Sequence, residues 1–194
     1  KRFNMRMHRS DANFDDKALA RAVQFSRDNG VRIYITVNNL LSETELPAMR
    51  DYLRLLQEIT PDALIIQDLG LLVLAEELGL TLPLHASVMM NTHNEPAVRT
   101  LQEHGVTRVV FNREMTLGQL SLIKERTGIE LEYFIHGDMC VAQSGQCIHS
   151  GVVFGQSSNR GRCLKPCRWP YRFTVDGSPL ADEFDPGPYK LALK

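Results

Sequence analysis

The chain has 194 residues, and 43% of them are hydrophobic, which is enough for one domain with a sizeable core. The net charge of −1 excludes a surface that is basic throughout, so a polyanionic partner would have to bind a local patch. We find no apolar run long enough to span a membrane and no signal-peptide pattern, and we expect a cytoplasmic protein without a membrane partner.

Apolar runs rich in β-branched residues alternate with segments that carry an apolar stripe at helical spacing. The expected strands are 31–37, 63–67, 83–88, 108–112 and 130–135. The expected helices are 15–29, a helix opened by the capping box of Ser42 and Glu45, then 70–78, 94–104, and a helix that runs from the capping box of Thr116 and Gln119 to Gly128.

The regular order of strand and helix indicates either a (β/α)8 barrel or an open doubly wound sheet. The strands are apolar along their length, which fits a parallel sheet covered on both faces. No G-x-G-x-x-G motif follows any of them, which removes support from the nucleotide-binding open sheet. We therefore predict an α/β, TIM-barrel-like fold for residues 1–138. Five strands do not close a barrel, so we expect a partial barrel whose remaining strands lie outside this sequence.

Residues 139–175 contain every cysteine of the chain, at the spacing C-x6-C-x15-C-x3-C. The four are Cys140, Cys147, Cys163 and Cys167. Four thiols this close in sequence are enough for a tetrathiolate metal site. The stretch has no Asp or Glu, and its basic residues would either balance the negative charge of a metal cluster or contact RNA phosphates. These basic residues are Arg160, Arg162, Lys165, Arg168 and Arg172.

The cysteines have three interpretations. Two disulfides would suit a secreted protein, which nothing else in the sequence indicates. Structural zinc sites usually have cysteines closer together than C-x6-C, so zinc is the second alternative. An iron–sulfur cluster tolerates irregular spacing, and we favour it. The radical-SAM signature is excluded because Pro170 stands where that motif would place its third cysteine.

The pattern changes after the cysteines. We predict a strand over 169–175, a tight turn at Asp176-Gly177, and a hairpin and loop over 176–194 that lead into a missing C-terminal part. Residues 189–194 are expected to begin a further strand. The expected organisation is therefore a partial barrel over 1–138, a cluster-binding segment over 139–175, and the hairpin and loop.

Polar residues follow the apolar strands, and barrel enzymes hold their active sites at these carboxyl ends. Glu132, Phe134 and His136 share one face of the fifth strand, which would place His136 at the barrel mouth beside Cys140. Ordinary helix caps and loop residues also account for such polar positions. The candidate catalytic residues are Arg113, Glu114 and His136, and the candidate substrate-binding residues are Arg6, Asn91 and Arg168.

The cysteine segment resembles the signature of the collagenase-like peptidases, peptidase family U32. The matching stretches are Glu132-Tyr-Phe-Ile-His-Gly-Asp-Met-Cys140, Gly145-Gln-Cys-Ile-His-Ser150, Asn159-Arg-Gly-Arg-Cys163 and Pro166-Cys-Arg-Trp-Pro-Tyr171. A weaker likeness extends over the whole chain. The resemblance implies a TIM-barrel-like domain with a [4Fe-4S] cluster on the four cysteines. It also implies either peptidase activity or oxygen-independent hydroxylation of RNA or of a small aromatic precursor.

Our first hypothesis is an iron–sulfur-dependent, oxygen-independent hydroxylase that acts on RNA or on a small aromatic molecule. The first rival is a collagenase-like peptidase in which the cysteines hold a structural zinc ion. Peptide hydrolysis has no motif of its own here, because neither H-E-x-x-H nor G-x-S-x-G occurs. The second rival is a non-catalytic RNA-binding module that uses the basic stretch.

Overall fold

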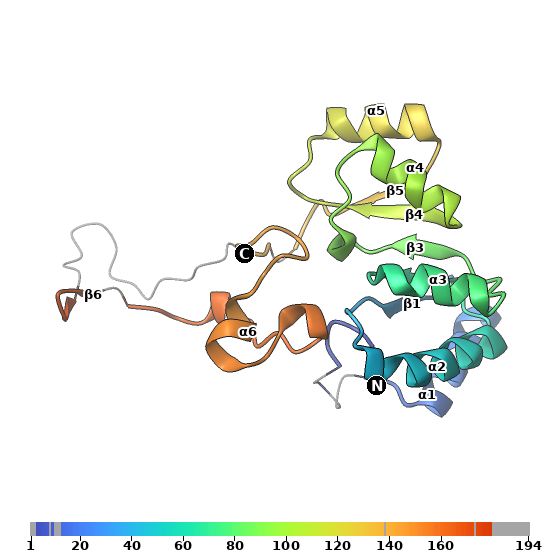
Figure 1. Ribbon diagram of the computed structural model, residues 1–194, viewed down its shortest axis with the longest axis horizontal. Helices are drawn as coiled ribbons and strands as arrows, with labels where there is room; N and C mark the ends of the chain where they lie inside the picture. Colours follow the sequence, from blue (N-terminus) through green and yellow to red (C-terminus); the bar gives the residue numbers. More distant parts are fainter. Residues whose placement is uncertain (1–2, 8, 10–12, 138, 173, 180–194) are drawn as a thin grey trace.

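The computed structural model describes residues 3–7, 9, 13–137, 139–172 and 174–179. A five-stranded sheet forms the centre of the fold, and its strands lie side by side in chain order (Figure 1). They are β1 Tyr34–Val37, β2 Ala63–Ile66, β3 Leu84–Ala86, β4 Val106–Phe111 and β5 Glu130–Tyr133. Every pairing between neighbours is parallel. All five predicted strands are therefore confirmed.

The main helices separate these strands along the chain, and all five predicted helices are confirmed. They are α1 Asp16–Asp28, α2 Leu46–Ile59, α3 Leu69–Glu77, α4 Glu95–Glu103 and α5 Leu117–Thr127. Both predicted capping boxes form. The backbone N–H of Ser42 donates to Glu45 at 2.8 Å, just before α2, and that of Thr116 donates to Gln119 at 2.8 Å, at the start of α5. Gly128 ends α5 in the left-handed conformation.

The strand order decides between the two predicted fold classes. A doubly wound sheet reverses its strand order at a switch point, whereas a TIM barrel adds each parallel strand beside the previous one. The order from β1 to β5 has no reversal. The described strands therefore form part of a TIM-barrel-like sheet. Among the described residues, no helix has both the length and the apolar character needed to cross a membrane.

The two faces of the sheet differ because successive residues of a strand point to opposite sides. One face carries a continuous apolar core shared with the helices. Its strand residues include Val37, Ile66, Ala86, Val109 and Phe111, and its helix residues include Met49, Leu53, Leu56, Val98 and Leu120. This packing fixes the strands relative to one another and so places their carboxyl ends along one edge.

The opposite face carries a polar group near the amino ends of the strands. The guanidinium of Arg108 lies 5.1 Å from the ring centre of Tyr34 and pairs with Glu130 at 2.7 Å and Glu132 at 3.5 Å. His85 is in register with Arg108 and meets Tyr34 edge-on, with ring centres 4.9 Å apart. The imidazole is buried, and its Nδ1 has no hydrogen-bond partner among the described residues.

The buried His85 predicts a specific dependence of stability on pH. Burial lowers the pKa of His85 from 6.5 to about 4, and the charge of Arg108 acts in the same direction, against Glu130. The folded protein keeps the imidazole neutral at pH values where the unfolded chain protonates it. The free energy of unfolding should therefore be highest above about pH 6.5 and fall by roughly 3 kcal/mol as the pH drops toward 4. Chemical denaturation at a series of pH values measures this slope.

A His85→Gln variant should lose that slope between about pH 6.5 and 4.5, whatever its stability at neutral pH. The matched control is His104→Gln, at the exposed end of α4, which should keep the wild-type slope. A His85 variant whose stability falls with pH as steeply as the wild type would contradict the prediction.

The chain after the cysteines differs in part from the sequence-based expectation. The strand predicted over 169–175 is wrong for most of its length, because within the described residues only β6 Thr174–Val175 of that range is a strand. Pro166 and Pro170 lack the N–H that strand pairing needs, and Pro166 instead begins the turn η5 Pro166–Arg168. The short helix α6 His149–Phe154 was also not predicted from the sequence.

The predicted tight turn at Asp176-Gly177 is confirmed. It joins β6 to β7 Ser178–Pro179 as an antiparallel pair. Both turn residues have positive φ, 49° and 79°, as a type I′ turn requires. Residues 180–194, including the strand expected over 189–194, lie outside the described residues.

Candidate metal centre

The segment 139–171 lies at the carboxyl ends of the strands (Figure 1) and is anchored there at three places. The first anchor is the loop after β1, where the N–H of Leu40 donates to the carbonyl of Asn159 at 2.9 Å. Arg160 donates to the carbonyl of Leu40 at 2.8 Å and pairs with Glu45 at 2.8 Å. Because Glu45 also belongs to the capping box before α2, this anchor joins the segment to the start of a barrel helix.

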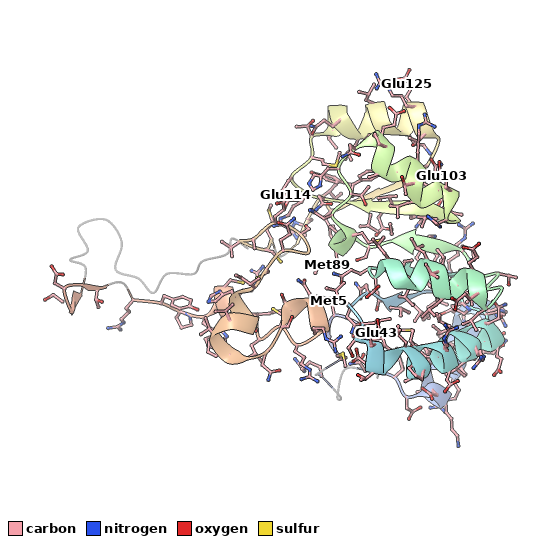
Figure 2. The ribbon with its side chains drawn as sticks, in the orientation of Figure 1. Met5, Glu43, Met89, Glu103, Glu114 and Glu125 are labelled. Carbon is pink, nitrogen blue, oxygen red and sulfur yellow. The ribbon has the colours of Figure 1, made fainter. Side chains whose placement is uncertain are left out.

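The second anchor consists of two close backbone approaches at glycines. Gly161, with φ of 69°, packs so tightly on the N-terminal segment that a Cβ would overlap the carbonyl of Asn4 and the side chain of Met7. Gly145, with φ of 73°, packs in the same way on the carbonyl of Met89 in η3 Val88–Met90, the turn after β3. Figure 2 shows Met89 between the strands and the segment. Neither position has room for a side chain.

The third anchor is Arg113, which follows β4. Its Nη2 donates to the carbonyls of Cys140 and Ala142, both at 2.7 Å, and its Nη1 donates to Ser144 Oγ at 3.2 Å. It also pairs with Glu114 at 3.3 Å, and only 17% of its side chain is exposed. The donors of this guanidinium are engaged with the segment. The geometry therefore favours a positioning role for Arg113 over the catalytic role expected from the sequence.

Hydrogen bonds within the segment fix the backbone near the other cysteines. Ser158 Oγ donates to the carbonyl of Cys147 at 2.6 Å. Arg168, which follows Cys167, donates to the carbonyl of Met139 at 2.8 Å. These contacts join residues that are far apart in sequence, so the segment is folded on itself as well as onto the barrel.

All four cysteines belong to the described part of the chain and carry free thiols. Cys140 is exposed, and the other three are partly buried. Burial raises the pKa of Cys167, and the three other thiols raise it as well, whereas the charge of Arg168 lowers it.

The donor chemistry of the segment fits a tetrathiolate cluster. It offers four soft sulfur ligands with no disulfide, and residues 139–175 contain no carboxylate that would repel the cluster. Within the described ranges, however, no three His, Cys, Asp or Glu side chains are arranged as a finished metal site.

A layer of uncharged polar side chains lies at the same edge of the sheet. Each of the first four strands is followed by an inward-facing residue of this kind, and the four are Asn38, Gln67, Ser87 and Asn112. Asn38 Nδ2 donates to Ser87 Oγ at 3.4 Å across the intervening β2. Gln67 is 6% exposed and Asn112 0%, and the carboxamide oxygen of each has no donor among the described residues. Unmatched buried acceptors are costly, so a ligand or a water molecule is expected to supply the donors.

The structure brings one predicted site residue into this layer and leaves two outside it. Asn91 adopts the left-handed conformation, and its Oδ1 accepts from Asn112 Nδ2 at 2.8 Å. Glu114 and His136 are both exposed. Because β5 ends at Tyr133, His136 lies beyond the sheet and not on its inner face as expected.

The remaining predicted residues lie around the segment. Arg6 is exposed in the N-terminal part of the chain, and Arg168 bonds to the segment backbone. Asn112 and the anchoring function of Arg160 were not predicted from the sequence. A polar residue that ends an apolar strand was the available signal for Asn112, whereas the partners of Arg160 are set by the tertiary fold.

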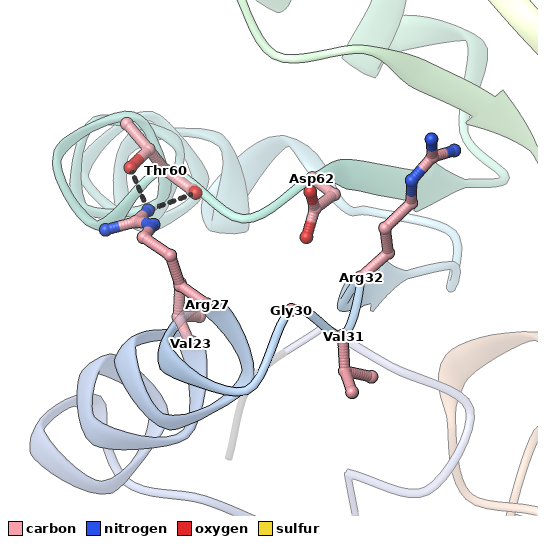
Figure 3. Close-up of a pocket in the computed structure, with 7 residues that line it drawn as sticks. All are labelled: Val23, Arg27, Gly30, Val31, Arg32, Thr60 and Asp62. Carbon is pink, nitrogen blue, oxygen red and sulfur yellow. Dashed lines mark hydrogen bonds between the residues drawn. The ribbon is translucent and has the colours of Figure 1, made fainter.

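A cavity of about 240 Å³ lies at the opposite, amino edge of the sheet (Figure 3). The Nη2 of Arg27 donates to Thr60 Oγ1 at 2.7 Å and to the carbonyl of Thr60 at 3.0 Å. Asp62 accepts from the N–H of Ile33 at 2.8 Å. Arg27 and Asp62 thus bond to nearby backbone, and barrel enzymes use the other edge of the sheet, so we assign the cavity a packing role.

A partial TIM-barrel-like sheet with a four-cysteine segment on its carboxyl edge defines the class of protein. The sequence model of peptidase family U32 matches residues 1–192. The chain therefore belongs to peptidase family U32, as the cysteine signature predicts. The solved structure of the U32 peptidase Mk0906 has a TM-score of 0.56 and 15% identity, over 78% of this chain and 64% of that one. At this identity the likeness concerns the fold alone.

Three relatives are similar in sequence. An uncharacterized protease of Methanocaldococcus jannaschii is 34% identical over all of this chain and 46% of its own length. The tRNA hydroxylation protein P1 of Bacillus subtilis is 34% identical over 88% of this chain and 41% of its own. The 23S rRNA 5-hydroxycytidine C2501 synthase of Escherichia coli is 37% identical over 87% of this chain and 25% of its own length. The chain thus spans less than half the length of each.

The close approach at Gly161 predicts that a methyl group there releases the segment from the barrel. Gly161→Ala should speed tryptic cleavage after Arg160 and Arg162 by about fivefold or more, because an overlap with fixed backbone costs at least about 1 kcal/mol. The control is Gly155→Ala, since Gly155 has a similar φ of 65° but open space around its Cα. Equal cleavage rates in the two variants would show that the contact does not hold the segment.

Proposed function

We propose that this chain is part of an iron–sulfur-dependent, oxygen-independent hydroxylase that modifies RNA. The observation that carries the proposal is that one short segment carries four free thiols and is anchored where barrel enzymes hold their active sites. The cofactor is a [4Fe-4S] cluster, with zinc on the same residues as the alternative. The proposed ligands are Cys140, Cys147, Cys163 and Cys167.

The names of two relatives support RNA as the substrate. One is a tRNA hydroxylation protein and the other a 23S rRNA 5-hydroxycytidine synthase. The basic, acid-free stretch 139–175 suits phosphate groups. Within it, Trp169 is 40% exposed and packs against Phe154 with ring centres 5.1 Å apart, which offers a supported aromatic surface for stacking on a base.

The cluster, when bound, would supply the one-electron redox chemistry for hydroxylation without oxygen. The side chains of the protein itself would bind and orient the RNA substrate. The buried oxygens of Gln67 and Asn112 accept N–H groups from the edge of an inserted base and so fix the plane of its ring. The segment 139–171 covers this edge and limits the access of water. The guanidinium groups of Arg113 and Arg168 offset the negative charge of the ligand set.

Purification of the full-length protein without oxygen tests the cofactor. We expect a brown protein with broad absorption near about 400 nm and iron and sulfide in equal amounts. Replacement of any one cysteine by serine should remove most of the colour, because a hydroxyl is a poor ligand for this cluster. The melting temperature of the metal-free variant should match that of the metal-free wild type, which separates loss of the ligand from loss of the fold.

A colourless protein that binds one zinc ion per chain would instead support the zinc alternative. In that case the cysteines would hold the segment together, and hydroxylation would lose its cofactor.

Nucleoside analysis of host RNA tests the reaction. Cells without the gene should lack one modified nucleoside, heavier than its parent by a single oxygen atom, and the wild-type gene should restore it. A gene with Cys140→Ser should fail to restore it. An unchanged set of nucleosides would exclude RNA hydroxylation under the growth conditions used.

Peptidase activity is the second candidate, because one relative is named as a protease. Its candidate residues, Glu114 and His136, are exposed and follow different strands, and Glu114 pairs with Arg113 at 3.3 Å. Digestion of gelatin by the pure protein, abolished by His136→Ala and retained in the cysteine variants, would favour this candidate over hydroxylation.

A further inference from the structure

We propose that Arg113 and Arg168 form a clamp that holds the first ligand residue, Cys140, in position before the cluster is inserted. Their guanidinium groups donate to two successive backbone carbonyls, Arg168 to Met139 at 2.8 Å and Arg113 to Cys140 at 2.7 Å. The inference rests on the proposed function, because it assigns both arginines to assembly of the same metal centre. Arg113 and Arg168 are therefore positioning residues, because they act on the cluster only through Cys140.

The backbone of Arg113 is held in a fixed position at the end of β4. The hydroxyl of Tyr133, at the end of β5, lies 2.9 Å from the carbonyl of Arg113 and 2.8 Å from that of Met115. This contact between neighbouring strands fixes the loop after β4. The mostly buried guanidinium then holds Cys140 and Ala142 by their carbonyls. A planar fork of donors can hold two acceptors at defined angles, which a lysine ammonium does not do.

Arg168 joins the two ends of the cysteine segment. It follows Cys167, the last ligand residue, and donates to the carbonyl that precedes Cys140, the first. The bond therefore closes a loop of 29 positions between Arg168 and Met139. Closing such a loop costs conformational entropy, and here the protein meets that cost before any metal is present.

The clamp also affects the electrostatic environment of Cys140. Backbone carbonyl oxygens repel an anionic cluster, and the two guanidinium groups draw the oxygens of residues 139, 140 and 142 toward themselves. They add two positive charges beside the first ligand at the same time. Contacts of this kind around metal ligands typically change metal affinity by 10- to 100-fold, so we expect an effect of that size.

Hydrogen exchange of the metal-free, full-length protein tests the clamp without the cofactor. In Arg113→Gln and in Arg168→Gln, the amides of residues 139–144 should exchange about tenfold faster than in the wild type. Arg172→Gln is the matched control, because it removes the same charge from an exposed position directly after the segment. Exchange that is unchanged in both clamp variants, or equally faster in the control, would overturn the proposal.

Cluster reconstitution then separates position from charge. Arg113→Gln should bind the cluster roughly tenfold more weakly than the wild type, and Arg113→Lys, which keeps the charge but loses the fork, should recover only a small part of that loss. Full rescue by lysine, in affinity and in the visible spectrum, would mean that the charge alone matters and would refute the clamp. A wild-type protein that takes up no iron would defeat the proposed function, while the exchange result would still decide whether the two arginines hold Cys140.

Discussion

Burial of the carboxyl edge of the sheet is the constraint on which the rest of the structure depends. Parallel strands end together, so their terminal carbonyls and the polar side chains that follow meet along one line. The segment 139–171 lies on this line and is held by the loops after β1, β3 and β4. The thiols therefore owe their positions to tertiary contacts with separate parts of the barrel.

The charges of the chain are arranged differently in its two parts. On the inner face of the sheet, opposite charges pair directly, as between Arg108 and Glu130. In residues 139–175, by contrast, Arg and Lys occur without any Asp or Glu. Sequence alone left two interpretations of these residues, charge balance for a cluster and contact with phosphates. The structure shows that these residues differ in their surroundings, because Arg168 bonds to the segment backbone whereas Arg172 is exposed.

Local features of the sequence predicted the barrel elements well. Helix α5 is an example: it begins with the capping box of Thr116 and Gln119 and ends at Gly128. Both signals depend only on residues close in sequence, so they can be recognised without the tertiary structure. The strand predicted over 169–175 failed because the prolines around Trp169 outweigh its aromatic and β-branched composition. The cysteines were identified by spacing and family resemblance. The contacts of Arg113 and Arg160 could not be predicted, since their partners lie 27 and 120 positions away.

The four thiols come from one continuous stretch, whereas the groups that support this stretch come from the whole length of the sheet. The colour of the proposed cluster should therefore report on the integrity of the barrel. A substitution far from any sulfur, in the loop after β1 or at Tyr133 at the end of β5, would then lower the amount of iron that the protein incorporates. The proposed cluster would thus depend on a fold that is complete before the metal enters.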